Sequence, residues 1–301
     1  FIPMFNPDGR MSDPPQRRNM NNVDLNRNHN FGFTPGGFEG HGPVPFSEPE
    51  TQALKKLVDR VPFTGSISYH SNGDLVLHPW LFQFNIPTPD EDFYLELGNR
   101  MAELMAYEYS HPFRYTVAGG YDDYMYSEFG TMTFTMETGK TKIPSDPSNV
   151  IPLVQFQNIN SFVMFLDRMK GPGMTGLVTD SLSGKPVRAK ISIEGKEDDS
   201  LMKPRRAEPQ FGRYTRLLEP GDYKVTYSAM GYLAKENIIT VGEDELLQVH
   251  DVSMQPTGFP VVVQTAVLDG VSGTGEGNGN RLVNRGESVE RVLTLRNIGG
   301  V

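Results

Sequence analysis

The feature that most constrains the fold is a change in sequence pattern near Gly173. Before it, the sequence predicts helices over 47–58, 90–109 and 150–169, with β-rich runs at 65–69 and 130–136 between them. Strands that alternate with helices indicate a largely parallel or mixed sheet with helices on its faces. We therefore predict an α/β first part with a mixed, mostly parallel sheet.

After Gly173 the sequence consists of short alternating runs separated by turn signals such as Glu219-Pro220-Gly221-Asp222. This spacing is typical of a small all-β sandwich. The predicted strands are 176–179, 189–193, 212–217, 221–229 and 238–241. The domain hypothesis is a first domain over 1–171, a β-sandwich over 172–257 and the start of a further, truncated β domain over 258–301.

Composition excludes several classes of protein. The formal net charge of −9 argues against nucleic acid as a partner, because nucleic-acid binders usually carry clustered Lys and Arg. No run approaches the roughly 18 consecutive apolar residues of a membrane-spanning helix. With no Cys in the chain, any transition metal must be held by His, Asp or Glu. Composition predicts neither the redox compartment nor the oligomeric state.

Two residues that could act as a metal ligand or a general base follow apolar strands. His70 comes directly after the strand predicted at 65–69, and Glu137 follows the one predicted at 130–136. Sites in α/β folds lie at such strand ends. A buried carboxylate is costly unless it is paired or functional. His70 taken alone is more typical of a structural histidine that makes one hydrogen bond.

Further candidates lie in polar segments. Asn26 and Arg27 stand together in Val23-Asp24-Leu25-Asn26-Arg27-Asn28, and an Arg fork beside an amide suits recognition of a carboxylate. The same cluster could instead cap a turn. Tyr115 precedes Gly119-Gly120 in a segment that could form a mobile loop. Taken alone, Tyr115 is more typical of a surface aromatic residue.

In combination these motifs resemble the zinc carboxypeptidases of the family that includes carboxypeptidase A, over roughly residues 1–170. The resemblance rests on several motifs in order and in register: Asn6-Pro7-Asp8-Gly9, Val23-Asp24-Leu25-Asn26-Arg27-Asn28, Ser47-Glu48-Pro49-Glu50-Thr51, Tyr69-His70-Ser71, Leu77-His78-Pro79-Trp80 and Phe134-Thr135-Met136-Glu137. Residues 173–256 resemble the transthyretin-like, carboxypeptidase regulatory-like sandwich that follows this domain in one branch of the family.

The resemblance implies a role for each candidate. His70 becomes the third zinc ligand, and Asn26 with Arg27 holds the C-terminal carboxylate of a peptide. Glu137 becomes the general base, and Tyr115 closes over the substrate. Arg17 stabilises the oxyanion, with neighbouring Arg18 as the alternative.

One departure from the family is serious. Its first two zinc ligands come from a His-x-x-Glu motif upstream of Asn-Pro-Asp-Gly, and none of the six His residues here is followed by Glu three positions later. The chain opens on Phe1-Ile2-Pro3-Met4-Phe5, so we expect an incomplete N-terminus, with the other two ligands of a single Zn²⁺ in a missing segment. The chain by itself would then be inactive. The alternative is a catalytically disabled relative that serves as a binding or adhesion module.

Specificity and location follow only from the resemblance. Asp122, fifteen residues before Glu137, aligns with the base of the family's side-chain pocket, where Asp accompanies a preference for C-terminal Lys or Arg. The opposing interpretation is that Asp122 or Asp123 caps the adjoining turn. The resemblance also implies peptide or protein C-termini as substrate and a secreted or periplasmic location, with deacylation or cell-wall peptide cleavage as variants of the reaction.

Overall fold

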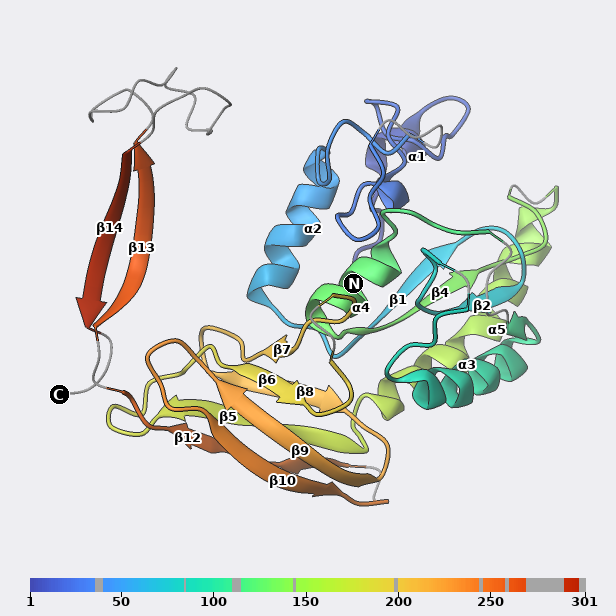
Figure 1. Ribbon diagram of the computed structural model, residues 1–301. Coiled ribbons are helices and arrows are strands. Elements are labelled where there is room, and N and C mark those ends of the chain that lie inside the picture. Colours follow the sequence, from blue (N-terminus) through green and yellow to red (C-terminus); the bar gives the residue numbers. More distant parts are fainter. Residues whose placement is uncertain are drawn as a thin grey trace.

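The structure is a computed structural model that describes most of the chain. Described are residues 1–35, 40–83, 85–109, 115–142, 145–197, 200–243 and 246–257, together with the backbone of 260–268 and 290–297. The chain forms an α/β part followed by an all-β part, as the sequence pattern predicts (Figure 1). Within the described residues no helix has both the length and the apolar character that a membrane crossing requires.

The α/β part is built on a mixed sheet with the strand order β1-β4-β2-β3. The edge strand β1 pairs with β4 in parallel, β2 joins β4 antiparallel, and β2 pairs with β3 in parallel. The prediction of a mixed, mostly parallel sheet is therefore confirmed. The strands are β1 (Gly65–His70), β2 (Leu75–Leu77), β3 (Glu108–Tyr109) and β4 (Met132–Glu137).

Strand β4 contacts helices on both faces of the sheet, because its side chains alternate between the two faces. Met132, Phe134 and Met136 enter the hydrophobic core formed with the helices α3 and α5. Thr133 and Thr135 face the other way and hydrogen-bond to Asp122 of α4. The helices are α1 (Pro7–Met11), the 3-10 helix η1 (Leu25–Arg27), α2 (Pro49–Arg60), α3 (Glu91–Met105), α4 (Tyr121–Phe129) and α5 (Pro147–Arg168).

The predicted helix boundaries need three corrections. The helix predicted to reach residue 109 ends at Met105, because Ala106 is left-handed and the chain then enters β3. The N-cap of α2 is Glu48, and the hydroxyl of Ser47 donates to the Glu48 carboxylate instead of capping the helix. The last helix begins at Pro147, three residues earlier than predicted, since Pro is well suited to the first helical turn.

The β part contains two sheets, with the orders β10-β9-β6-β7 and β11-β5-β12, and β8 also pairs with β5. All five predicted strands are present, and β7, β11 and β12 are additional. One apolar core, which includes Val178, Ile191 and Val225, lies inside this sandwich. The strands are β5 (Gly173–Asp180), β6 (Lys190–Ile193), β7 (Arg205–Arg206), β8 (Arg213–Leu217), β9 (Gly221–Ser228), β10 (Lys235–Val241), β11 (Leu247–Val249) and β12 (Val252–Met254).

The predicted third β region, 258–301, lies largely outside the described residues. Only the backbones of β13 (Pro260–Leu268) and β14 (Glu290–Asn297) are described, and they pair antiparallel.

A buried ion pair joins the α/β part to the β part. Arg216 of β8 donates from Nη2 to Asp90 Oδ2 at 2.8 Å, and both side chains are almost fully buried. The hydroxyl of Tyr126 on α4 donates to the same carboxylate oxygen at 2.9 Å. The contact between the two parts thus includes a buried charged pair.

Candidate active site

Two predicted site residues meet at the carboxyl ends of adjacent strands. His70 is the last residue of β1 and Glu137 the last of β4, and the parallel register pairs the two residues directly. Paired residues on neighbouring strands place their side chains on the same face of the sheet, about 5 Å apart. The imidazole and the carboxylate therefore belong to one site.

The residues two positions earlier on each strand support this pair. Ser68 Oγ lies 3.1 Å from His70 Nε2, and Thr135 Oγ1 donates to Asp122 Oδ2 at 2.5 Å. Since alternate residues of a strand share a face, a polar column extends beneath the site between the sheet and α4.

Asn26 and Arg27 are positioned by η1. Asp24 caps this turn by accepting from the Asn26 backbone N–H at 3.1 Å. The Asn26 Oδ1 accepts from the Tyr121 backbone N–H at 2.7 Å, which leaves the amide Nδ2 as the donor end of the side chain. Arg27 is buried and donates to the Asn26 carbonyl at 2.9 Å.

Arg17 is held close to this turn by an ion pair, since its Nε donates to Asp24 Oδ2 at 2.6 Å. Burial alone lowers the pKa of Arg17, but the Asp24 carboxylate and then Tyr115 and Glu137 raise it above its ordinary value. Arg17 lines the site pocket, whereas Arg18, the alternative, bonds to Asn22 Oδ1 at 3.2 Å. This placement favours Arg17 over Arg18 as the second cation of the pocket, beside Arg27.

The Tyr115 segment is tied down at its C-terminal side. Val117 donates from its backbone N–H to Leu81 at 2.7 Å, and Gly119 exchanges backbone hydrogen bonds with Phe31 and His29. Gly119 has a φ of +67°, and a Cβ there would lie 2.4 Å from the Arg27 carbonyl oxygen, so this close approach requires glycine. Tyr115 itself is half-exposed. The predicted loop is thus anchored to the turn that carries Arg27.

A small pocket brings six of the seven predicted site residues together. Its walls come from the η1 region, the Tyr115 segment and the ends of β1, β2 and β4. The pocket is lined by Arg17, Asn26, Arg27, His70, Leu77, Leu81, Tyr115, Val117, Thr135 and Glu137. The seventh residue, Asp122, lies behind Thr135.

Burial sets the ionisation of the two strand-end residues. It lowers the pKa of His70 to about 4, with Arg17 contributing in the same direction, so the imidazole is neutral at pH 7. Burial raises the pKa of Glu137, although Arg17 offsets part of this effect. A neutral imidazole can bind a metal, and a carboxylate with a raised pKa is a better general base.

Asp122 is fully buried on α4, and its Oδ1 has no hydrogen-bond partner among the described residues. Burial raises its pKa to about 6. The capping interpretation does not match the structure, because the N-cap of α4 is Gly120 and Asp123 accepts from the Leu81 backbone N–H. Asp122 is therefore a buried carboxylate one side chain away from the pocket.

The described residues do not form a complete metal site. They contain no cluster of three or more His, Cys, Asp or Glu side chains able to hold a metal ion. A catalytic zinc site uses three protein ligands, and His70 supplies at most one. The zinc expected from the sequence therefore does not fit the described part of the chain alone.

Sequence reasoning missed three supporting residues. Asp24 orients Arg17, Ser68 contacts His70 and Thr135 connects the pocket to Asp122. The alternation Ser66-Ile67-Ser68-Tyr69-His70 and Thr133-Phe134-Thr135-Met136-Glu137 could have identified two of them, because it places the polar residues on one face.

These features define a polar pocket at the carboxyl ends of a mixed α/β sheet, lined by a histidine, a carboxylate, two arginines and an asparagine. The profile of the zinc carboxypeptidase family of M14 peptidases matches residues 1–161. The chain therefore belongs to this family.

Curated relatives extend the similarity into the β part. Human carboxypeptidase Z is 29% identical over 86% of this chain, and mouse carboxypeptidase N catalytic chain is 26% identical over 80%. The chain spans 46% and 61% of their respective lengths. Among solved structures, carboxypeptidase A from Helicoverpa armigera is 20% identical, with a TM-score of 0.45 over 54% of this chain and 48% of its own.

Proposed function

We propose that this chain carries the substrate-binding half of a zinc-dependent metallocarboxypeptidase that hydrolyses the C-terminal peptide bond of peptides or proteins. The observation that carries the proposal is the direct pairing of His70 with Glu137 at one pocket that also contains Arg17, Asn26 and Arg27. Positively charged side chains can bind the free carboxylate of a peptide, and a general base beside them can then act at the neighbouring peptide bond.

Each residue has a separate task in this proposal. The Arg27 guanidinium and the Asn26 amide bind the substrate carboxylate through charge-assisted hydrogen bonds. Arg17 stabilises negative charge on the oxygen of the scissile carbonyl. Glu137 takes a proton from the attacking water, and Tyr115 covers the bound residue.

The zinc site requires further ligands. In the proposal His70 binds the metal through its neutral imidazole, and two ligands come from outside the described residues. We expect this chain alone to hold little zinc and to be inactive. Elemental analysis after dialysis against zinc checks this, and stoichiometric zinc in the unextended chain would contradict it.

Peptide binding tests the carboxylate site without any metal. A short peptide with a free C-terminus should bind the chain, and its C-terminal amide should bind about tenfold or more weakly, since charged hydrogen bonds contribute about 1.5–3 kcal/mol. Arg27→Ala should remove this difference, whereas the exposed Arg10→Ala should keep it. Equal affinity of the acid and the amide for the unmodified chain would refute the proposal.

Side-chain preference is a finer part of the proposal. The Oδ1 of Asp122 has no hydrogen-bond partner among the described residues, which favours a cationic C-terminal residue, Lys or Arg, that reaches past Thr135. Asp122→Asn should then reduce binding of a peptide ending in Arg but not of one ending in Leu. Tighter binding of the Leu peptide by the unmodified chain would exclude the basic preference.

A peptide-binding module without catalysis is the second candidate. The absence of a three-residue metal cluster from the described part favours it, and the contacts to a carboxylate do not depend on metal. For either function we propose a secreted or periplasmic location, on the basis of the relatives.

A further inference from the structure

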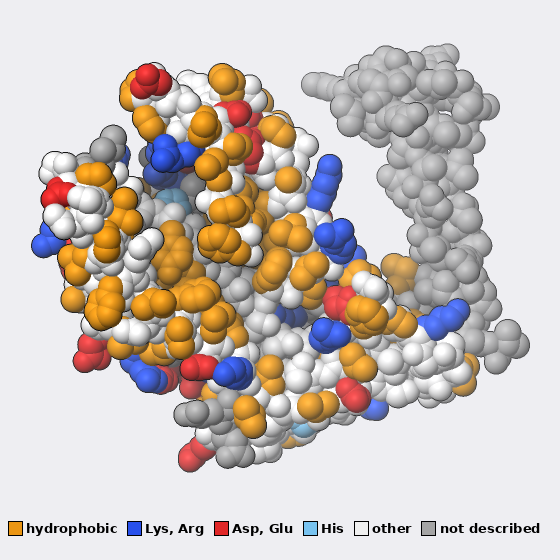
Figure 2. Space-filling view, turned by 180° about the vertical axis from the view of Figure 1, so that it is seen from behind, with side chains coloured by type: hydrophobic (Ala, Val, Ile, Leu, Met, Phe, Trp, Pro, Cys, Tyr) orange, Lys and Arg blue, Asp and Glu red, His pale blue; other side chains and the backbone are white. Residues whose placement is uncertain are grey.

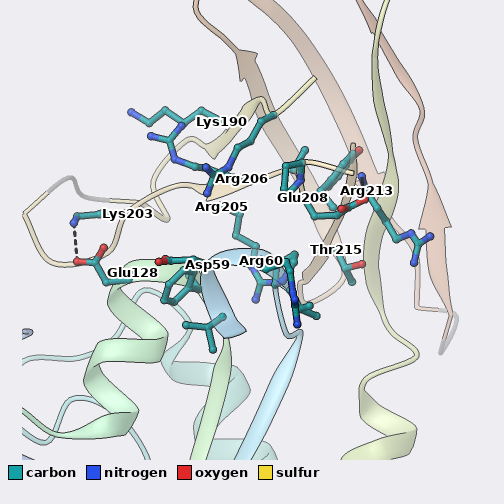
Figure 3. A pocket seen from close by; sticks show the side chains of 18 of the residues that line it. Asp59, Arg60, Glu128, Lys190, Lys203, Arg205, Arg206, Glu208, Arg213 and Thr215 are labelled. Atoms are coloured by element: carbon teal, nitrogen blue, oxygen red, sulfur yellow. Dashed lines mark hydrogen bonds and ion pairs between the residues drawn. The ribbon is translucent and has the colours of Figure 1, made fainter. Parts of the chain in front are cut away.

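A second cleft of the described residues lies away from the candidate active site. It has a volume of about 610 Å³ and lies between the α/β part and the β part (Figure 3). Val61 and Pro62, which precede β1, and Phe129, which precedes β4, form one wall. His70 and Glu137 are at the opposite ends of these strands, roughly 20 Å away at 3.3 Å per residue. A ligand of the cleft therefore occupies a separate site.

The cleft is strongly cationic in an acidic protein. Eight Lys or Arg residues and three carboxylates line it, which leaves five positive charges in a chain with a formal net charge of −9. The cations are Lys55, Arg60, Arg188, Lys190, Lys203, Arg205, Arg206 and Arg213. In Figure 3, Arg60 comes from the α/β wall, and Arg206 and Arg213 come from the β wall. An anionic ligand fits this surface far better than a neutral one.

The three carboxylates of the cleft are already engaged. Asp59 is paired with Lys55 at 2.5 Å, and Glu128 with Lys203 at 2.6 Å. Glu208 accepts from the backbone N–H groups of its own turn, including that of Phe211 at 2.6 Å. These carboxylates leave most of the arginine charge in the cleft uncompensated.

Arginines supply that uncompensated charge. Within the described residues Arg60, Arg188, Arg206 and Arg213 have no carboxylate within 4.0 Å. These four side chains are exposed. Arginine forks bind carboxylates and other oxyanions through two parallel hydrogen bonds. The free arginines are therefore the residues that select the ligand.

Arg205 adds a buried positive charge on the β wall. Its side chain is only 5% exposed, and it donates to the Gly130 carbonyl, while its Nε has no partner among the described residues. Burial, and then the charge of Arg216, lowers the pKa of Arg205 to about 9. An anion in the cleft would stabilise this charged guanidinium.

Apolar side chains distinguish between classes of anion. Phe211 is 53% exposed, and the Arg213 guanidinium lies 5.6 Å from the centroid of its ring. Phe129, Val61 and Pro209 add further apolar surface. A surface of arginines interleaved with aromatic and aliphatic groups matches a peptide that carries both carboxylates and apolar side chains. A sulfated glycan would leave the apolar part of the lining without a partner.

We propose that the cleft between the α/β part and the β part binds an acidic polypeptide segment with apolar residues among its Asp and Glu side chains. The carboxylates pair with Arg60, Arg188, Arg206 and Arg213, and the apolar residues pack on Phe211 and Phe129. The site holds a partner polypeptide without contacting the residues of the catalytic pocket.

Fluorescence anisotropy with a labelled nine-residue peptide of Glu and Phe tests the proposal on the full 301-residue chain. The peptide carries a C-terminal amide, which weakens its binding at the carboxylate site, and Arg27→Ala should leave its binding to the cleft unchanged, so the two proposals fail independently. We expect binding that weakens as salt is raised, and none for the matching peptide of Lys and Phe. Arg206→Ala combined with Arg213→Ala should weaken binding about tenfold, which corresponds to about 1.4 kcal/mol.

Arg100→Ala, at an exposed position on α3, is the matched control and should bind as the unmodified chain does. Because all three arginines are exposed, the variants should fold, and their circular dichroism checks this. An unchanged affinity of the double variant would overturn the proposal. So would a sulfated oligosaccharide that displaces the peptide and binds more than tenfold more tightly, since the cleft would then be a glycan site.

Discussion

The α/β part and the β part differ in how completely they cover their apolar residues. Helix α5 of the α/β part leaves seven large apolar side chains 42–71% exposed: Ile151, Leu153, Phe156, Ile159, Phe162, Val163 and Leu166. The exposed apolar side chains of the β part, such as Leu182 and Ile238, are spread over separate loops and strands. Figure 2 shows hydrophobic side chains gathered over the upper, α/β part, and fewer on the β part below.

The part with the self-contained core is not the part that carries the candidate active site. The β part closes its own core between two sheets, whereas the α/β part carries the polar pocket and takes Met202 and Leu217 of the β part into its core. Its edge strand β1 also has one side unpaired within the described sheet. Uncovered apolar surface and open strand edges promote association. The α/β part should therefore depend on neighbours, and the β part should not.

Separating the two parts gives the largest expected effect. Residues 172–257 made alone should fold as a monomer with a cooperative thermal melt. Residues 1–171 alone should associate, because α5 and the surface under Met202 and Leu217 are exposed. Size-exclusion chromatography and thermal denaturation measure both. A monomeric, cooperatively melting 1–171 fragment would contradict the comparison.

The ion pair between the parts gives the next effect. Asp90→Ala leaves Arg216 buried without its main partner, which should reduce the free energy of unfolding by about 3–5 kcal/mol. Urea denaturation measures this. Asp59→Ala breaks the exposed pair with Lys55 and should cost less than about 1 kcal/mol. Equal effects of the two variants would mean that the junction adds little to stability.

The carboxylate of Asp90 should also make the stability of the chain fall in acid. Burial alone raises the pKa of Asp90, but Arg216 and Lys196 hold it below its ordinary value of 3.8. The contribution of ionised Asp90 to the free energy of unfolding is therefore present in full above about pH 4. It is lost as the pH falls through the lower pKa of the folded state. Unfolding curves from pH 5 to pH 2 should show this loss in the unmodified chain and a smaller one in Asp90→Ala.

The buried Asp122 should make stability depend on pH in the opposite sense to Asp90. Its pKa is raised to about 6, so the folded state holds the proton more tightly and stability falls as pH rises from about 4 to 6. Asp122→Asn keeps an acceptor for Thr135 and should stabilise the chain at pH 7 by on the order of 2 kcal/mol. The exposed Glu96→Gln should change nothing. A destabilised Asp122→Asn would show that the ionised carboxylate has an unrecognised cationic partner.

The sequence predicted the elements better than it predicted their partners. Alternating Met132, Phe134 and Met136 indicated a buried strand, and its end correctly located Glu137. The pairing of Glu137 with His70 and the position of Asp122 behind Thr135 depend on strand order and on α4, which local pattern did not predict. The arginine cleft was missed because residues from distant segments form it only when the two parts meet.

A hydroxyl in the core of the β part gives a smaller effect. Tyr214 OH lies 2.8 Å from Tyr227 OH and donates to the His250 carbonyl at 2.7 Å. Tyr214→Phe should cost about 1–2 kcal/mol, because buried polar groups lose a partner while the ring packing stays. If the β part is self-contained, the same loss should appear in the isolated 172–257 fragment. A loss confined to the full chain would mean that the α/β part supports this core.

The smallest change in unfolding free energy should come from the exposed face of α5. Phe156→Ser combined with Ile159→Ser removes two side chains that are 71% and 57% exposed, so stability should shift by no more than about 0.5 kcal/mol each. Light scattering should nevertheless detect weaker self-association at high concentration, because the apolar patch is smaller. The matched change Ile238→Ser with Leu182→Ser, at dispersed positions of the β part, should leave association unaltered. If both pairs reduced association equally, total apolar exposure rather than its concentration on α5 would control the solubility of the chain.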